Sequence, residues 1–150
     1  MPDNNATAPA RDAALKYLGY RMRTRREMER YLAKKGYTEA AIIDAIGMLE
    51  RNRYIDDLVF AKQFIESSLR FNKWGMKKIR YELALKGVAP DIIDEAVEAA
   101  DNPAGEIILR LVEKRIDCPA SELDAAEKRK LYAYLMGRGF SYDEIYAALT

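Results

Sequence analysis

The sequence contains one cysteine and no histidine in 150 residues. Cys118 has no second thiol for an internal disulfide and no histidine with which to build a Cys/His metal or nucleophile site. Glycine-rich phosphate loops and G-x-S-x-G sequences are also missing, so the common motifs of phosphoryl and acyl transfer are absent. We therefore expect a protein that is not an enzyme and that needs no metal or cofactor.

Long hydrophobic runs are missing as well. No apolar run approaches the ~20 residues of a membrane span, and Met1–Ala10 lacks the basic start and apolar centre of a signal peptide. We therefore expect no membrane association and a cytoplasmic location. Residues 1–10 are small and polar and include two prolines, which predicts a flexible leader.

The charges are unevenly distributed along the chain, although the formal net charge is only +1. Residues 11–35 hold nine Lys or Arg against three Asp or Glu, whereas residues 88–127 hold three against eleven. A basic surface favours phosphates or acidic proteins as partners, and an acidic surface repels nucleic acid. An uneven but merely solvated surface remains the alternative.

Three glycines, Gly36, Gly87 and Gly139, lie 51 and 52 residues apart and mark a repeat of about fifty residues. Eight residues before each glycine stands an apolar residue, four before stands a leucine, and immediately before stands a cation. Glycine suits the left-handed backbone that closes a helix, and a cation suits the negative C-terminal end. Each glycine is therefore expected to end a helix with one apolar face.

A further helix is expected to begin two or three residues after each glycine. Thr38, Ala89 followed by Pro90, and Ser141 stand at the positions of its N-cap. With one helix before each glycine-terminated helix, the repeat predicts an all-α fold, an elongated tandem of three three-helix units. We place these units at residues 11–53, 54–102 and 103–150.

Helix-boundary signals are densest between residues 50 and 87. Asp56 and Asp57 are expected to cap a helix that begins near Leu58, which explains this carboxylate pair better than a metal or acid/base site. Thr24 and Glu27 have the spacing of a capping box. The residues that we expect to define the framework are Gly36, Asp57, Phe60, Ala61, Gly75, Ile79, Leu83, Gly87 and Gly139.

The turn at each glycine also has the spacing of a helix-turn-helix DNA reader. Such a reader needs basic and amide side chains on the helix after the turn. The helix after Gly87 instead carries acidic residues and no Lys or Arg, and the other two positions are also acidic. Sequence-specific DNA reading is therefore disfavoured.

Two groups of cations stand at the start of the second helix of units one and two, and aromatic residues flank them. Helix N-termini attract phosphate, and arginine beside aromatics adds stacking. Tyr20, Phe71 and Trp74 are the aromatics, although Trp74 also fits a core or staple position. The cations that we expect to bind a filament or DNA are Arg21, Arg23, Arg25, Arg26, Lys73, Lys77, Lys78 and Arg80.

Three stretches of the sequence carry a family resemblance. They read Arg25-x-Glu27-Met28 with Leu32-x-x-Lys35-Gly36, then Tyr54-Ile55-Asp56-Asp57-x-x-Phe60-Ala61, then Gly75-x-x-x-Ile79-x-x-Glu82-Leu83-x-x-Lys86-Gly87. From about Arg11 to Leu149 the chain resembles the RecX family of bacterial regulatory proteins. The middle motif is the most specific of the three.

This resemblance implies a tandem of three-helix units and a non-enzymatic inhibitor of the RecA recombinase. Such a regulator binds the groove of the RecA–DNA filament and restrains strand exchange, ATP hydrolysis and the coprotease activity of the SOS response. The partners expected are the RecA filament and possible direct contacts to single- or double-stranded DNA, and the chain itself is expected to be a monomer. A non-sequence-specific nucleic-acid-binding helical repeat protein remains the alternative.

Overall fold

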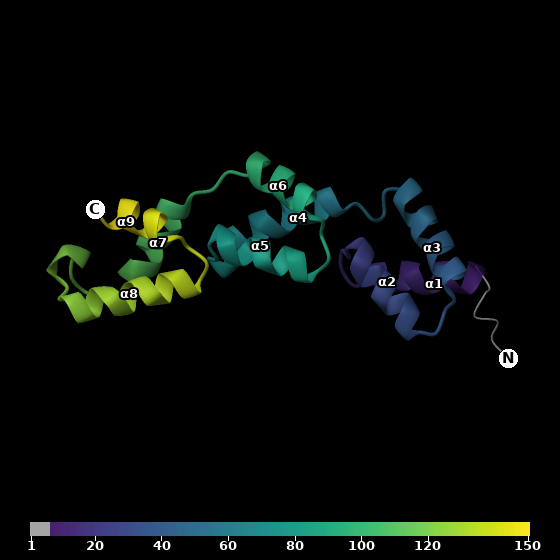
Figure 1. The fold of residues 1–150 in the computed structure, drawn as a ribbon, viewed down its shortest axis with the longest axis horizontal. Helices are drawn as coiled ribbons and strands as arrows, with labels where there is room; N and C mark the ends of the chain where they lie inside the picture. Colours follow the sequence, from purple (N-terminus) through teal and green to yellow (C-terminus); the bar gives the residue numbers. More distant parts are fainter. Residues whose placement is uncertain (1–6) are drawn as a thin grey trace. The chain divides into compact units, whose positions relative to one another are not determined.

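The structure, a computed structural model, describes residues 7–150, and these residues form helices without any strand (Figure 1). The all-α class predicted from the repeat is confirmed. The described elements are α1 (Thr7–Leu18), α2 (Arg25–Lys34), α3 (Glu39–Arg51), α4 (Asp57–Ser67), the π-helix η1 (Ser68–Asn72), α5 (Met76–Leu85), α6 (Pro90–Ala99), α7 (Ala104–Glu113), the 3-10 turn η2 (Ala120–Glu122), α8 (Ala125–Gly137) and α9 (Tyr142–Leu149).

The helices follow one another as three triplets, α1–α3, α4–α6 and α7–α9, as the repeat predicted. By contacts the chain divides into two compact units. The first unit runs to Ala61 and includes Leu83–Glu95, and the second unit consists of Lys62–Glu82 and Ala96–Thr150. Helices α4, α5 and α6 each contribute to both units, so the limits 11–53, 54–102 and 103–150 remain a proposal.

The predicted leader is too long at its C-terminal end. Thr7–Ala10 already form the first turn of α1, and the side chain of Ala10 is fully buried. Proline is tolerated in the first turn of a helix because its missing N–H has no partner there, so Pro9 does not prevent the start at Thr7. The part of the predicted leader at residues 1–6 lies outside the described residues.

The core of the first triplet combines small and branched side chains. Helix α1 packs on α3 through Ala10 and Ala14, whose methyl groups allow the helices to approach closely. Met28 and Leu32 of α2 and Leu49 of α3 fill the remaining space and are fully buried. Burying one such side chain contributes about 1.5–3 kcal/mol. The residues at the positions of Met28 and Leu32 in the other two triplets are buried as well, and they are Ile79, Leu83, Leu131 and Leu135.

All three predicted glycine turns have the left-handed backbone. The φ angles are 91° at Gly36, 84° at Gly87 and 102° at Gly139. In each turn the residue after the glycine donates its N–H to the carbonyl of the leucine four residues before the glycine, at 3.1–3.2 Å. This bond pattern is the Schellman motif, in which a glycine satisfies carbonyls that the helix leaves open.

The helix starts agree with the sequence at most positions. Thr24 with Glu27 and Ser141 with Glu144 form capping boxes, Thr38 caps α3, and Pro90 is the first residue of α6. Asp124 with Glu127 forms a third box that starts α8. We did not predict it, because the irregular stretch before α8 obscured the repeat.

The capping role expected for the Asp56–Asp57 pair is correct for Asp56 alone. Asp56 Oδ1 accepts the N–H groups of Leu58 and Val59 at 3.0 and 3.2 Å. Asp57 is instead the first residue of α4, and its Oδ1 accepts the N–H of Arg25 at 2.9 Å. A carboxylate at a helix start is favourable, and here it serves the start of α2 rather than its own helix.

Within the first unit, the start of α2 docks against the Gly87 turn. Thr24 is fully buried, and its Oγ1 donates a hydrogen bond of 2.7 Å to the carbonyl of Lys86. A Cβ on Gly87 would lie 2.3 Å from the Cβ of Arg26. Gly87 therefore serves two purposes, because it adopts the left-handed backbone and also makes room for α2.

Within the second unit, the start of α5 docks against the Gly139 turn in a related way. The N–H groups of Gly75 and Lys77 donate to the carbonyls of Arg138 and Gly139, at 2.8 and 3.1 Å. A Cβ on Gly75 would lie 2.3 Å from the backbone carbon of Gly139. The two chain segments thus touch through their backbones, and glycine is needed at position 75 for that reason.

We predict that Gly75→Ala lowers the free energy of unfolding by about 1–3 kcal/mol, because the added methyl group meets backbone that has to move. Urea denaturation followed by far-UV circular dichroism measures this loss. Gly137→Ala is the matched control, since a Cβ there meets nothing within 4 Å. Alanine should raise stability at this helical position by up to about 1 kcal/mol. Equal stability of Gly75→Ala and the unmodified protein would contradict the backbone contact.

Candidate functional site

The first basic cluster, defined as Arg21, Arg23, Arg25 and Arg26, lies at the start of α2 and is largely neutralised within the chain. Arg21 pairs with Glu27 at 2.9 Å, and Arg25 pairs with Glu29 at 3.0 Å. Arg25 also reaches Glu50 at 3.2 Å, and Arg26 lies 4.0 Å from Glu29. Exposed ion pairs add little stability. They do weaken the attraction of this cluster for phosphate or acidic partners.

Arg23 belongs to a stack of side chains on the first triplet. Its guanidinium lies 3.7 Å from the centroid of the Tyr17 ring, and Tyr17 stacks on Tyr31 with the centroids 3.8 Å apart. Lys35 Nζ lies over the Tyr31 ring, 5.5 Å from its centroid. Cation–π contacts of this kind contribute roughly 0.5–1 kcal/mol at exposed sites. Arg23 therefore has a structural contact as well as a charge.

Asp57, which accepts the Arg25 N–H, is a partly buried carboxylate with an altered pKa. Burial raises the pKa of Asp57 above its ordinary value, and the hydrogen bond from the Arg25 backbone partly opposes this rise. Asp44 behaves in the opposite way. Its hydrogen bond with Arg11, 2.8 Å long, lowers the pKa of Asp44.

These two carboxylates predict opposite dependences of stability on pH. The stability that Asp57 contributes falls as the pH rises from its unfolded pKa to its raised folded pKa. The contribution of Asp44 is present above its unfolded pKa and is lost as the pH falls through its lowered folded pKa. As the pH rises from acidic to neutral, the stability of Asp57→Asn relative to the unmodified protein should therefore increase. The relative stability of Asp44→Asn should decrease over the same range. Urea titrations at a series of pH values test this, and slopes of the same sign would contradict it.

The second basic cluster, defined as Lys73, Lys77, Lys78 and Arg80, lies at the start of α5. Within residues 7–150 none of its three lysines takes part in an ion pair. Lys77 and Arg80 are exposed, whereas Lys73 and Lys78 are partly buried. This cluster therefore offers lysine charges without carboxylate partners, in contrast to the arginines of the first cluster.

Lys78 is tied to the framework despite its charge. Its Nζ lies 4.6 Å from the centroid of Trp74, and Trp74 packs against Phe64 with the centroids 6.4 Å apart. The Cβ of Lys78 also faces Gly139, where a second Cβ would come within 2.5 Å. The core position considered for Trp74 is thus correct in part, since the ring is partly buried and covered by a lysine.

Lys73 has a backbone conformation that the sequence did not predict. Its φ is 56°, in the left-handed region, where it ends the π-helix η1. The carbonyl of Lys73 accepts a hydrogen bond from Arg138 Nε at 3.2 Å, and the carbonyl of Asn72 accepts one from Arg138 Nη2. Arg138 therefore satisfies the open end of η1. The sequence indicated a break only at Trp74–Gly75, because a single added residue in a helical turn leaves no periodic signal.

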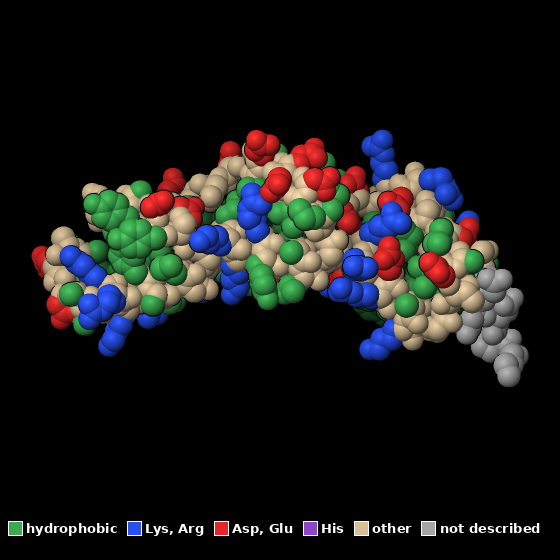
Figure 2. All heavy atoms as spheres, viewed as in Figure 1, with side chains coloured by type: hydrophobic (Ala, Val, Ile, Leu, Met, Phe, Trp, Pro, Cys, Tyr) green, Lys and Arg blue, Asp and Glu red, His purple; other side chains and the backbone are tan. Residues whose placement is uncertain are grey.

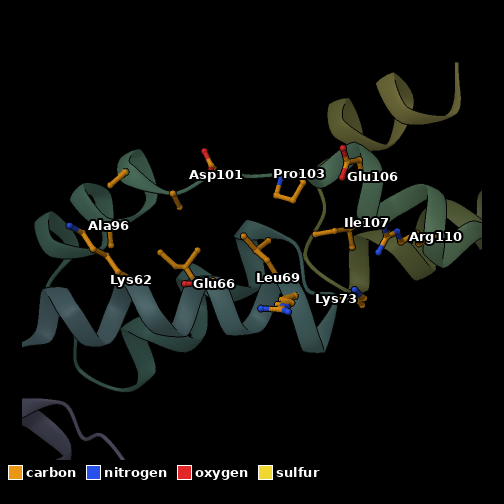
Figure 3. Close-up of a pocket in the computed structure, with 14 residues that line it drawn as sticks. Lys62, Glu66, Leu69, Lys73, Ala96, Asp101, Pro103, Glu106, Ile107 and Arg110 are labelled. Atoms are coloured by element: carbon orange, nitrogen blue, oxygen red, sulfur yellow. The ribbon is translucent and has the colours of Figure 1, made fainter.

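A cavity of about 610 Å³ lies beside Lys73 in the second unit (Figure 3). Side chains from α4, η1, α6 and α7 line it, with Leu69 and Ile107 among its apolar residues. Its cations are Lys62, Arg70, Lys73 and Arg110, and its carboxylates are Glu66, Asp101 and Glu106. Of these residues we predicted only Lys73 as a site residue. The others are spread from position 62 to position 110, so no local motif unites them.

Across residues 7–150 no group of three or more His, Cys, Asp or Glu side chains could hold a metal ion. In the same residues, no helix combines the length and the apolar character needed to cross a membrane.

Three family models match the chain in succession and correspond to its three helix triplets. They describe the first, second and third three-helix domains of RecX, and they match residues 10–49, 56–97 and 106–149. The chain belongs to the RecX family. The resemblance seen in the sequence motifs is thereby confirmed.

Individual RecX proteins match nearly the whole chain. The regulatory protein RecX of Pelodictyon phaeoclathratiforme is 40% identical over 149 residues, which cover 99% of this chain and 91% of that protein. RecX of Prosthecochloris aestuarii is 35% identical, with 97% and 93% covered. The crystal structure of RecX from Lactobacillus salivarius superposes with a TM-score of 0.85 at 28% identity and covers 95% of this chain and 93% of that one. Membership of this family gives the chain a regulatory, non-enzymatic role.

Proposed function

We propose that this chain inhibits the RecA recombinase by binding the RecA–DNA filament along its groove. The observation that carries the proposal is membership of a family of regulatory proteins through all three helix triplets. A filament presents the same surface repeatedly along its axis. Three similar triplets in one chain can therefore make several modest contacts whose effects multiply.

The second basic cluster and the adjoining cavity are the surfaces that we assign to the filament. Lys73 contributes to both, and Lys77 is exposed without an ion pair in the described residues. The cavity is lined by four cations, three carboxylates and several apolar side chains. Carboxylates would repel a nucleic acid, whereas a protein surface can match both signs of charge. The mixture therefore favours RecA protein as the occupant.

The inhibition follows from selective binding to one filament state. A ligand that prefers one conformation shifts the population toward it by its difference in affinity. Bound across neighbouring RecA protomers, the chain would oppose the changes in the filament that accompany ATP hydrolysis and strand exchange. The coprotease activity in the SOS response would be restrained in the same way, so the proposed role belongs to DNA repair and recombination.

Non-sequence-specific binding to bare nucleic acid is the second candidate function. Exposed aromatic residues beside cations favour it, since Phe71 is 71% exposed with Arg70 over its ring, and Tyr20 is 84% exposed. Unpaired bases can stack on such rings while the cations attract phosphate. This candidate requires no RecA.

The two functions predict different affinities for bare and RecA-coated single-stranded DNA. A filament regulator should bind the coated strand more tightly at both low and high salt, because most of its contacts are to protein. A simple nucleic-acid binder should bind both strands similarly and lose its affinity at high salt as counterions return to the phosphates. Fluorescence anisotropy of a labelled strand at two salt concentrations measures the difference. Equal affinities that vanish together at high salt would exclude the RecA proposal.

Lys73→Gly provides a test of the filament surface without unfolding the chain. Glycine accepts the left-handed backbone at this position, so only the side chain and its charge are lost. We expect filament binding to weaken by about two- to fivefold, which is typical of one charge at an interface rim. Adding Lys77→Gln to Lys73→Gly should weaken filament binding further.

Arg53→Gly is the matched control for this experiment. Arg53 also has a left-handed backbone, with φ 58°, and is exposed, but it lies outside the second basic cluster and the cavity. Its replacement removes one positive charge at the same kind of position. Equal losses of filament binding for Lys73→Gly and Arg53→Gly would show that net charge, rather than this surface, determines binding.

A further inference from the structure

Helices α8 and α9 expose an aromatic surface that the sequence motifs did not indicate. A hollow of about 950 Å³ lies on it, lined by Tyr132, Met136, Tyr142 and Tyr146 among other residues. Figure 2 shows hydrophobic side chains gathered over α8 and α9, with Lys and Arg side chains beside them. We call Tyr132, Met136, Tyr142, Tyr146, Lys128 and Arg129 the tyrosine face.

Tyr142 contacts both of the other tyrosines, and Tyr142 and Tyr146 still present ring surface to solvent. The centroids of Tyr132 and Tyr142 lie 5.2 Å apart with the rings tilted by 44°, and those of Tyr142 and Tyr146 lie 6.3 Å apart at 14°. Tyr142 is 56% exposed. The rings of Tyr142 and Tyr146, which are close to parallel, therefore offer exposed aromatic surface to a planar ligand.

The charged side chains that line this hollow have one sign. Lys128 and Arg129 are its charged lining residues, and no Asp or Glu side chain lines it. Asp143 and Glu144 of α9 lie outside the lining, and Glu144 accepts the N–H of Ser141 at 2.9 Å as part of the capping box. The cavity beside Lys73 differs in this respect, because three carboxylates line it. The charge of the tyrosine face therefore suits an anionic ligand.

We propose that the tyrosine face binds single-stranded nucleic acid, with unpaired bases stacked on the tyrosine rings and phosphates bound by Lys128 and Arg129. Stacking needs the flat face of a base, which a duplex keeps inside its own stack, so a single strand is the form that fits. An acidic protein segment would satisfy the two cations, but it gains less from the exposed rings of Tyr142 and Tyr146. This inference concerns the third triplet by itself and requires no RecA.

Photocrosslinking of the full chain tests the contact directly. The probe is an oligothymidylate that contains 5-iododeoxyuridine, which on irradiation couples to an aromatic ring stacked against it. We expect mass spectrometry to locate crosslinked peptides at Tyr132, Tyr142 or Tyr146. A duplex of the same length, with the iodinated base paired, should give little or no crosslink at these residues. Crosslinks confined to other parts of the chain would overturn the proposal.

A double variant measures the share of the tyrosine face in binding. Tyr142→Leu with Tyr146→Leu keeps apolar side chains but removes the rings, and should weaken binding of the bare strand by about tenfold or more, the loss typical of one or two stacked bases. Tyr54→Leu is the matched control, because Tyr54 is 57% exposed and lies outside this face. Circular dichroism should be unchanged in both variants.

The cations are tested through the salt dependence of binding. Lys128→Gln with Arg129→Gln should reduce the slope of log affinity against log salt by about 1.4, the value for two phosphate contacts on a single strand. An unchanged slope would show that the two cations do not bind phosphates and would overturn the proposal. A tyrosine double variant that binds the bare strand normally but the RecA-coated strand poorly would show a protein-docking surface and would also overturn it. The RecA proposal is judged separately, by the comparison of coated with bare strands.

Discussion

The fold depends on one recurring contact, in which the first turn of one helix packs against a glycine turn that ends another. In the first unit Thr24 donates to the carbonyl of Lys86, and in the second unit Gly75 and Lys77 donate to the carbonyls of Arg138 and Gly139. Helix starts have spare N–H groups and helix ends have spare carbonyls. The contact in the second unit pairs these groups directly, whereas in the first unit the Thr24 hydroxyl donates to the helix-end carbonyl. Close approach requires glycine, because a Cβ on Gly75 or Gly87 would overlap its neighbour.

Which parts of the fold could be predicted from the sequence depends on how far apart in the chain the contacting residues lie. The glycine turns, Thr24, Thr38, Ser141 and Pro90 were predictable, because caps and turns are set by residues within one helical turn of one another. The role of Asp57 at the start of α2 was not, since its partner lies 32 residues away. The left-handed Lys73 and the π-helix before it also left no periodic signal, because Arg138 stabilises them from a distant part of the sequence.

The candidate sites were predictable to a smaller extent, because counting cations along a chain does not reveal their partners. The arginines at the start of α2 formed the densest basic run, yet Glu27, Glu29 and Glu50 neutralise much of it. The lysines at the start of α5 are fewer, but they have no such partners in the described residues. On α8 and α9 the tyrosines are separated by ten and four positions and converge only when the two helices pack.

The docking contacts use neutral hydroxyl, amide and carbonyl groups. The geometry of the scaffold and the attraction exerted by the surface charges therefore depend differently on salt. Dissolved ions screen exposed lysines and arginines strongly, but they hardly affect hydrogen bonds between uncharged groups that are shielded from water. A change in ionic strength can therefore alter how strongly the exposed lysines and arginines attract an oppositely charged surface, while the helical scaffold keeps its own geometry.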